Sequence, residues 1–243
     1  MLTEQQIRQA LDGRILVITG AGISADSGIP TFRGKEGYWR KLDPMKLATP
    51  EAFRANPQLV WEWYLYRRKI VSEAEPNAGH EVIATLSHTA REFLLVTQNV
   101  DDLHERAGTR SDRMVKIHGD LFLNRCINAS CAEENREVFS ENALPKCPMC
   151  SSLLRPGVVW FGEALDRKTI QRVDDFLSDG LCDLVLVIGT TAQFGYIVHW
   201  ALKAAGRFGT IMEINPDDTG LSSVVHLGIR ERASAALPRI FKI

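Results

Sequence analysis

Four of the five cysteines are spaced as metal ligands are. Cys126 and Cys131 form one pair, and Cys147 and Cys150 form a second pair after a loop of moderate length. Four thiolates at such spacings can close a tetrahedral site around Zn²⁺, and they leave no position open for water or substrate. The spacing therefore predicts one structural zinc ion, which would substitute for the apolar core that this segment lacks. Four unligated thiols are the alternative interpretation.

A glycine-rich turn follows the apolar run 14–19. Paired glycines directly after a strand, here Gly20 and Gly22, let the backbone approach a pyrophosphate, whose charge the next helix N-terminus then meets. The third glycine, Gly28, comes later than in the dehydrogenase fingerprint. No acidic residue ends a second strand about 20 residues further on. The turn thus favours nucleotide binding, but not by an ordinary hydride-transferring dehydrogenase. The alternative interpretation is a tight turn that binds no ligand.

Polar side chains follow two further apolar runs. Gln98, Asn99 and Asp101 come after the run 93–97, and amides and carboxylates can bind ribose hydroxyls and a carboxamide. The alternative there is a helix start capped by Asn99 or Asp101. His118 ends the run 114–118 and has the chemistry of a general base near neutral pH. A structural, hydrogen-bonded histidine is the alternative.

The remaining pattern indicates which elements position these residues. Continuous rather than alternating hydrophobicity predicts strands that are covered on both faces of a mainly parallel sheet. The predicted strands are 14–19, 93–97, 114–118, 157–161, 183–189, 209–215 and 223–228. Helical spacing of apolar residues predicts helices over 77–90, 168–178 and 194–207. Their alternation predicts a Rossmann-like, doubly wound α/β fold.

Two segments interrupt this alternation. Residues 37–76 carry three of the five tryptophans and are predicted to be helical, and residues 121–154 carry the clustered cysteines. We expect both to be insertions that form a small helical and zinc-binding domain. Residues 1–36, 77–120 and 155–243 would then form the Rossmann-like domain. A ligand would bind in the cleft between the two, at the carboxyl ends of the strands.

Charge and hydropathy exclude several classes of partner. The chain has 243 residues, and its 29 Lys and Arg against 30 Asp and Glu give a formal net charge of -1. This balance lacks the basic surplus that non-specific binding to nucleic acid or to an anionic membrane requires. No apolar run reaches the roughly 18 residues of a membrane span, and no apolar signal segment opens the chain. We expect a cytoplasmic protein that binds neither nucleic acid nor membranes.

In their order along the chain, these motifs resemble those of the sirtuins, which are NAD-dependent protein-lysine deacylases. The resemblance spans nearly the whole chain. It rests on GAGISADSGIPTFRG (20–34), TQNVDDLH (97–104), IHGD (117–120), the paired cysteines, RPGVVWFGE (155–163), IGTT (188–191) and INP (214–216). The resemblance implies NAD as a co-substrate, one structural Zn²⁺ and His118 as the general base.

The resemblance also implies which residues bind NAD. They are Gly20, Ala21, Gly22, Ser24, Asp26, Thr31, Phe32, Arg33, Tyr38, Trp39, Gln98, Asn99, Asp101, Gly189, Thr190, Thr191, Asn215, Pro216, Asp217 and Ala233. Within this set, Gln98, Asn99 and Asp101 match the residues that hold the nicotinamide and its ribose. Thr191 departs from the serine of the family motif but keeps the hydroxyl.

The implied substrates are acylated lysine side chains of other proteins, bound as an extended strand. The matching segment consists of Val159, Trp160, Phe161, Gly162 and Glu163, and main-chain pairing of this kind tolerates most substrate sequences. The acyl oxygen would attack the ribose carbon that bears nicotinamide, and His118 would relay a proton from a ribose hydroxyl. The products would be free lysine, nicotinamide and O-acyl-ADP-ribose. Residues 192–198 depart from the commoner family pattern, which has a Tyr-Pro pair.

One further pair concerns the choice of acyl group. Tyr64 and Arg67 are three residues apart and share one face of a helix. They match the Tyr-x-x-Arg pair of the class III sirtuins, which prefer acidic acyl groups such as succinyl and malonyl. A guanidinium can bind a carboxylate in a bidentate geometry, and the phenol adds a donor. The alternative is a packing stripe of Trp61, Tyr64 and Leu65, with Arg67 and Arg68 in solvent.

Two other functions fit the same motifs. An enzyme with this NAD site could transfer ADP-ribose to protein instead of removing an acyl group. An NAD-responsive, zinc-containing binding module would need a disabled centre, yet His118, Asn99 and Asp101 are all present. A zinc-ribbon nucleic-acid binder is disfavoured because the cysteine segment is not rich in Lys or Arg.

Overall fold

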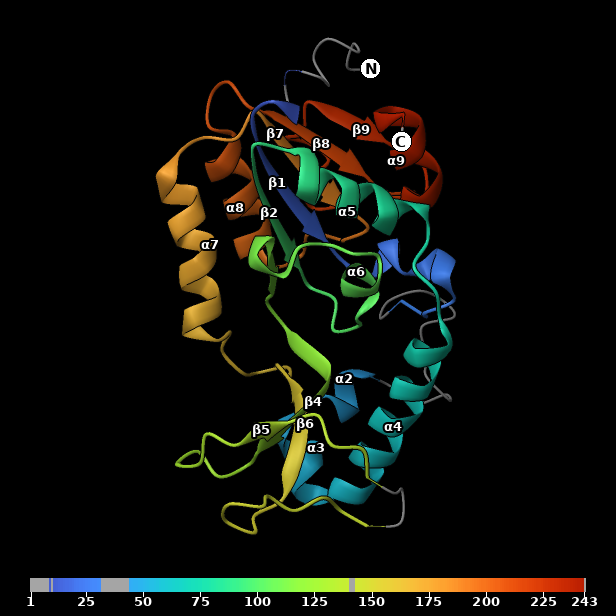
Figure 1. Cartoon of the computed structure of the whole chain (residues 1–243), viewed down its shortest axis with the longest axis vertical. Coiled ribbons are helices and arrows are strands. Elements are labelled where there is room, and N and C mark those ends of the chain that lie inside the picture. Colours follow the sequence, from blue (N-terminus) through green and yellow to red (C-terminus); the bar gives the residue numbers. More distant parts are fainter. Residues whose placement is uncertain (1–8, 10, 32–43, 140–142, 243) are drawn as a thin grey trace.

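The computed structural model describes residues 9, 11–31, 44–139 and 143–242, which form two lobes stacked along the long axis (Figure 1). The upper lobe contains a six-stranded, all-parallel sheet in the order β3-β2-β1-β7-β8-β9. Its strands are β1 (Arg14–Thr19), β2 (Glu92–Thr97), β3 (Met114–Lys116), β7 (Leu184–Ile188), β8 (Thr210–Ile214) and β9 (Leu227–Ile229). This confirms the predicted Rossmann-like class of fold.

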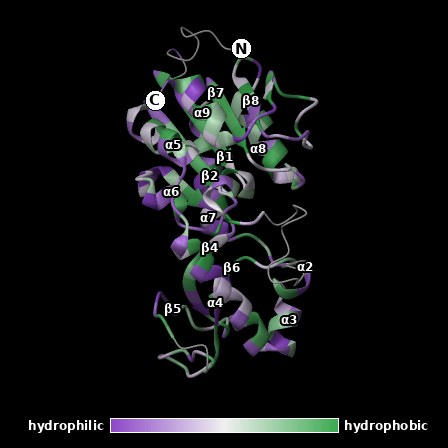
Figure 2. Ribbon diagram, turned by 90° about the vertical axis from the view of Figure 1, so that its right-hand side faces the viewer, coloured by the Kyte–Doolittle hydropathy of each residue, from purple (hydrophilic) through white to green (hydrophobic). Residues whose placement is uncertain are grey.

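Helices cover both faces of this sheet. Helices α5 (Ala78–Thr89) and α9 (Ala233–Phe241) cover one face, where the core includes Val17 and Leu186. Helices α7 (Arg167–Asp179) and α8 (Gly195–Ala205) cover the other face, where the core includes Ile18 and Val187. Neighbouring residues of one strand therefore enter opposite cores, which explains why β1 and β7 are apolar throughout. Figure 2 shows hydrophobic residues, in green, along the sheet of the upper lobe.

The order of the strands reverses between β1 and β7, which lie side by side at the centre of the sheet. From β1 the chain continues outward to β2 and β3, and from β7 it continues outward to β8 and β9 on the other side. After these two central strands the chain therefore continues to opposite sides of the sheet, and such a switch point is where doubly wound sheets bind ligands. Figure 1 shows the carboxyl ends of β1 and β2 pointing toward the lower lobe.

The lower lobe combines three helices with a small antiparallel sheet. The helices are α2 (Pro44–Leu47), α3 (Pro50–Ala55) and α4 (Pro57–Glu73). The sheet has the order β5-β4-β6, with β4 (Gly119–Cys126), β5 (Glu134–Asn135) and β6 (Leu154–Val158). Aromatic side chains fill the interface between helices and sheet, and Trp61 of α4 donates from Nε1 to the carbonyl of Leu154 at 2.9 Å. The prediction of helices in 37–76 is thus confirmed by α2, α3 and α4, while residues 37–43 lie outside the described residues.

Two predicted strands are displaced. The run 157–161 is strand only up to Val158, and it pairs with β4 in the lower lobe rather than with the parallel sheet. The segment turns at Gly162, whose φ of 87° ends extended structure. The run 223–228 becomes strand only at β9 (Leu227–Ile229). It begins in a turn, in which Ser222 bonds to Glu213 at 2.6 Å and to the N–H of Thr219 at 2.8 Å. The division of the chain into domains at 120 and 155 stays a prediction.

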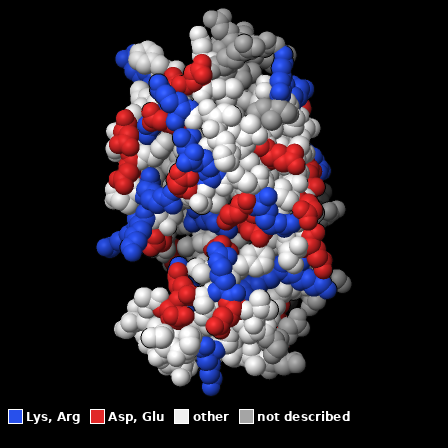
Figure 3. Space-filling view, in the orientation of Figure 1, with Lys and Arg blue, Asp and Glu red and all other residues white. Residues whose placement is uncertain are grey.

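Within the described residues, none of the helices has the length and hydropathy of a membrane span. On the face drawn in Figure 3, basic and acidic side chains are interspersed over both lobes.

Candidate active site

The loops that follow β1 and β7 interlock through three glycines. The N–H of Gly22 donates to the carbonyl of Gly189 at 2.8 Å. A Cβ on Gly20 would lie 2.7 Å from the Cβ of Thr190, and a Cβ on Gly22 would lie 2.7 Å from the Cα of Gly189. Gly189 itself has a φ of 60°, where glycine is favoured. Loop-to-loop packing therefore requires these glycines, independently of any ligand.

Gln98 joins the loop after β2 to this pair of loops. Its Nε2 donates to Oγ1 of Thr190 at 2.8 Å and to the carbonyl of Thr19 at 3.3 Å. The Nδ2 of Asn215, after β8, donates to the carbonyl of Thr190 at 3.3 Å. The structure thus brings Gln98, Thr190 and Asn215 together at the carboxyl edge of the sheet.

Ser24 is the centre of a buried polar network. Its hydroxyl donates to Oδ2 of Asp101 at 3.0 Å and accepts from Nδ2 of Asn99 at 3.1 Å. The Nε2 of His80 lies 3.4 Å from the same hydroxyl. Because Nδ1 of His80 accepts the N–H of Asn77 at 3.2 Å, the ring proton is on Nε2 and faces Ser24. Three residues that the resemblance assigns to NAD binding are therefore held in one arrangement.

Asp101 lies just before the short helix α6 (Leu103–Arg106), whose N-cap is Asp102. Oδ1 of Asp101 accepts the N–H of Leu103 at 3.2 Å, so its carboxylate contacts the first turn, but neither Asn99 nor Asp101 is the N-cap that the helix-start interpretation named. Burial raises the pKa of Asp101, while the hydrogen bonds from Leu103 and Ser24 and the charge of Lys116 act in the opposite direction. The carboxylate is therefore fixed by the protein before any ribose reaches it.

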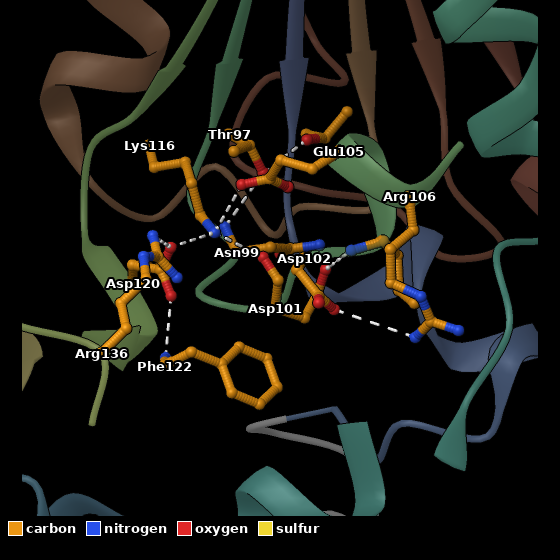
Figure 4. A network of polar contacts seen from close by, with 12 residues as sticks. Thr97, Asn99, Asp101, Asp102, Glu105, Arg106, Lys116, Asp120, Phe122 and Arg136 are labelled. Carbon is orange, nitrogen blue, oxygen red and sulfur yellow. Dashed lines mark hydrogen bonds and ion pairs between the residues drawn. The ribbon is translucent and has the colours of Figure 1, made fainter. Parts of the chain in front are cut away.

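Lys116 connects this loop to the lower lobe (Figure 4). Its Nζ donates to the carbonyl of Asp101 at 2.7 Å and pairs with Glu105 at 2.8 Å and Asp120 at 3.2 Å. The same Asp120 carboxylate pairs with Arg136 at 2.7 Å. The sequence analysis did not identify this lysine. Its position as a charged residue inside an otherwise apolar strand could have indicated it.

His118 lies between the loop after β2 and the start of α8. Its Nδ1 is 2.9 Å from the carbonyl oxygen of Gln98, and a carbonyl only accepts, so Nδ1 carries the ring proton. Its Nε2 is therefore an acceptor, and the hydroxyl of Tyr196 donates to it at 2.8 Å. Burial lowers the pKa of His118, and the bond to Gln98 raises it in part. A neutral imidazole with an accepting Nε2 is the form that a general base requires.

Two other histidines lie deeper in the upper lobe. The rings of His80 and His104 are 4.9 Å apart, and Nε2 of His104 lies 3.1 Å from the hydroxyl of Thr19. Burial lowers the pKa of His80 to about 4 and that of His104 well below its usual value. Both are neutral at physiological pH and enclosed, so His118 is the better candidate for proton transfer.

The segment 159–163 is folded back on the protein. The N–H groups of Val159 and Phe161 donate to the carbonyls of His118 at 2.8 Å and Ala48 at 2.9 Å. The N–H of Trp160 donates to Glu163, which also receives a bidentate bond from Arg155 at 2.5 and 2.9 Å. These main-chain donors are used within the chain, so pairing with a substrate strand through residues 159–163 stays a prediction.

Tyr64 and Arg67 are both buried on α4, with exposed fractions of 1% and 4%. Arg67 lies against the ring of Trp63, at 4.7 Å from its centroid, and 5.2 Å from that of Tyr64. Burial lowers the pKa of Arg67, and the nearby Tyr64 and Asp101 raise it in part. The alternative with Arg67 in solvent is therefore wrong. Arg68 is also withdrawn, since it donates to the carbonyl of Leu121 at 2.7 Å.

The four clustered cysteines converge at the end of the lower lobe. Their sulfur atoms all lie within 4.8 Å of one another. The distance is 3.5 Å between Sγ of Cys126 and Cys150, and 3.7 Å between Sγ of Cys131 and Cys147. Tetrahedral Zn–S bonds of ~2.3 Å place the sulfurs about 3.8 Å apart. These four side chains are therefore placed to bind one structural zinc ion.

The other residues assigned by the resemblance lie in several places. Asp26 bonds to Arg232 and Ser234, on either side of Ala233 at the start of α9. Pro216 and Asp217 are exposed in the loop after β8, and Thr191 is exposed after β7. Ala21 begins the turn after Gly20, and Thr31 ends the first described segment. Phe32, Arg33, Tyr38 and Trp39 lie outside the described residues.

A doubly wound parallel sheet with interlocked glycine loops at its switch point is the architecture of dinucleotide-binding α/β proteins. A model of the Sir2 family matches residues 20–195. The chain therefore belongs to the Sir2 family.

Named relatives and solved structures agree with this family. The chain is 44% identical over 236 residues to the NAD-dependent protein deacylase of Leptospira interrogans (serovar Lai), covering 94% of this chain and 92% of that protein. It is 39% identical over 229 residues to the NAD-dependent protein deacylase of Aquifex aeolicus, covering 93% of each chain. Among solved structures, a Sir2 homologue in complex with ADP-ribose has a TM-score of 0.89 at 39% identity, covering 99% of this chain and 96% of that one. A Sir2 homologue in complex with NAD has the same TM-score and identity, covering 100% and 93%.

Proposed function

We propose that this protein removes acyl groups from lysine side chains of other proteins with NAD as the co-substrate. One water is consumed, and free lysine, nicotinamide and O-acyl-ADP-ribose are released. The observation that carries the proposal is the neutral His118. Its Nδ1 donates to the carbonyl of Gln98, whose side chain contacts Thr190 in the loop after β7, and its Nε2 is left as an acceptor. The similarity to NAD-dependent protein deacylases supports deacylation, and the solved complexes of Sir2 homologues with NAD and ADP-ribose support NAD as the ligand.

Different residues of the chain bind NAD and transfer the proton in the proposed reaction. Gln98, Asn99 and Asp101 orient the nicotinamide end of NAD, because their side chains are already fixed by Thr190 and Ser24. The loop of Gly20 and Gly22 and the loop of Gly189 provide the surface on which the pyrophosphate rests. NAD supplies an activated ribose carbon for the acyl oxygen. Nε2 of His118 then accepts the proton of a ribose hydroxyl, which makes that oxygen nucleophilic toward the acyl carbon.

We further propose that acidic acyl groups such as succinyl and malonyl are accepted through Tyr64 and Arg67. Arg67 is a buried cation that lies against aromatic rings. Away from water, its interaction with a carboxylate is strong. The hydroxyl oxygen of Tyr64 accepts from Trp160 at 2.9 Å, which leaves its own proton to donate. The two residues therefore offer donors to one carboxylate from the same face of α4.

The experiment is a mass-spectrometric assay of one peptide that carries acetyl-, succinyl- or malonyl-lysine, with and without NAD. The proposal requires NAD-dependent loss of the acyl group together with stoichiometric nicotinamide and O-acyl-ADP-ribose. The His118→Ala variant is the matched control. A peptide that instead gains the mass of ADP-ribose would replace deacylation by protein ADP-ribosylation.

A further inference from the structure

Tyr196 of α8 contacts the atom of His118 that the reaction needs. Its hydroxyl lies 2.8 Å from Nε2, and the bond of Nδ1 to Gln98 makes that nitrogen an acceptor. Tyr196 therefore donates its proton to the lone pair of Nε2. An unprotonated ring nitrogen has one such lone pair, so only one hydroxyl can donate to it at a time.

The position of the Tyr196 hydroxyl is fixed by neighbouring aromatic rings. The ring of Phe194 stacks on Tyr196 with centroids 5.4 Å apart and an interplanar angle of 9°. The buried ring of Trp200 contacts Tyr196 at 5.1 Å. Phe194 also meets the edge of His118 at 5.9 Å. The phenol ring thus contacts two aromatic neighbours, and its oxygen lies within hydrogen-bond distance of the imidazole.

The groups around His118 keep both partners in the required protonation states. Burial raises the pKa of Tyr196 to about 12, so the phenol keeps its proton at physiological pH. On the side of β2, His118 meets the uncharged Gln98. The charged side chains nearest in sequence, Lys116 of β3 and Asp120 of β4, pair with each other. The pair of Tyr196 and His118 is therefore a neutral donor on a neutral acceptor.

We propose that Tyr196 is a positioning residue that caps Nε2 of His118 in the ligand-free protein and yields this place to a ribose hydroxyl when NAD binds. Only the displacement of Tyr196 by a ribose hydroxyl rests on the proposed function. The hydrogen bond from Tyr196 to His118 exists without ligand. A hydrogen bond donated to the neutral imidazole stabilises the neutral base against the imidazolium. The cap thus holds the base in its reactive tautomer until substrate displaces it.

The first test is an NMR titration of the histidine ring nitrogens in ligand-free protein, comparing wild type with Tyr196→Phe. This variant removes one oxygen and keeps the aromatic stack. We expect the pKa of His118 to rise by about 0.5–1 unit, which corresponds to the loss of one hydrogen bond. Tyr66→Phe, on α4, removes a phenol hydroxyl elsewhere and should leave the pKa of His118 unchanged. Equal pKa values in wild type and Tyr196→Phe would overturn the cap.

The second test is the pH dependence of turnover. The acid limb of kcat/KM reports the free enzyme and that of kcat reports the complex. In Tyr196→Phe the acid limb of the kcat/KM profile should move to higher pH by the same amount, about 0.5–1 unit. The acid limb of the kcat profile should lie at the same pH as in the wild type. A shift in both would show that the phenol remains on His118 in the complex and would refute its displacement. Absence of turnover in the wild type would defeat the proposed function, while the NMR titration would still decide the cap.

Discussion

The indole N–H of Trp160 donates to the hydroxyl oxygen of Tyr64 at 2.9 Å. This bond joins the segment after β6 to helix α4, and both side chains are buried. Because the Tyr64 oxygen is the acceptor in this bond, the hydroxyl keeps its own proton as a donor. The residue proposed to choose the acyl group is therefore coupled to the segment proposed to receive the substrate chain.

Arg67→Met is expected to lower kcat/KM for succinyl-lysine by roughly 10–150-fold and to leave acetyl-lysine little changed. The methionine keeps an apolar wall of similar length, while an interaction with an ionised group, about 1.5–3 kcal/mol, is lost. The observable is the ratio of the two efficiencies, since a folding defect would lower both. Tyr64→Phe is the companion variant and should reduce the succinyl preference by less. Equal losses on both acyl groups in Arg67→Met would return this pair to a packing role.

His118→Ala should slow deacylation by about 10²–10⁴-fold, the usual contribution of a general base. The affinity for NAD, measured by calorimetry, should stay close to that of the wild type, because the loops of Gly20 and Gly189 do not depend on this ring. Since burial lowers the pKa of His118, activity should persist to pH values below the usual range of histidine and then fall as the imidazole gains a proton. Near-normal turnover in the variant would remove the base assignment.

Purified protein should contain one Zn²⁺ per chain, bound by Cys126, Cys131, Cys147 and Cys150. The ion would hold together a segment whose core is small, so a strong chelator should lower the melting temperature of the lower lobe before it affects chemistry. Elemental analysis measures the zinc content, and calorimetry with and without chelator measures the melting temperature. Cys182→Ala, in the upper lobe, should keep the full zinc content. Metal-free protein from a chelator-free preparation would contradict the assignment.

Folding stability should fall on acidification because of His80. Its pKa is about 4 in the folded protein against about 6.5 when exposed, so the unfolded chain binds the extra proton between these values. The contribution of this neutral histidine is complete above pH 6.5 and is lost as the pH falls toward 4, by up to about 3 kcal/mol. Denaturant unfolding at pH 7 and at pH 4.5 measures the loss.

The control experiment compares two variants, in each of which one histidine is replaced by glutamine. His80→Gln should reduce the pH dependence of the unfolding free energy by the contribution of this ring, while the contribution of the buried His104 remains. His88→Gln, at an exposed position near the end of the same helix α5, should leave that pH dependence unchanged. If both variants retain the full slope, another group is responsible for it.

The sequence by itself determined the upper lobe and the metal ligands. Uninterrupted apolar runs such as 14–19 and 183–189 can be satisfied only by strands covered on both faces, and the structure places β1 and β7 there. The apolar run is a local property, so a pattern along the chain encodes it. The cysteine types and spacing predicted the four ligands, but the fold brings the two pairs together, since the shortest Sγ distances join Cys126 to Cys150 and Cys131 to Cys147.

Tertiary structure alone decided which distant residues meet. Gly20 and Gly22 look like ligand-binding glycines in the sequence, yet they contact Gly189 because β1 and β7 are neighbours in the sheet. Tyr196 reaches His118 across 78 positions, and the run 157–161 joins β4 instead of the parallel sheet. Such contacts depend on the order of strands and on the direction in which each loop leaves them. A periodicity of apolar residues encodes which residues are buried but not which residues become neighbours. The contact between Tyr196 and His118 could therefore not be predicted from the sequence.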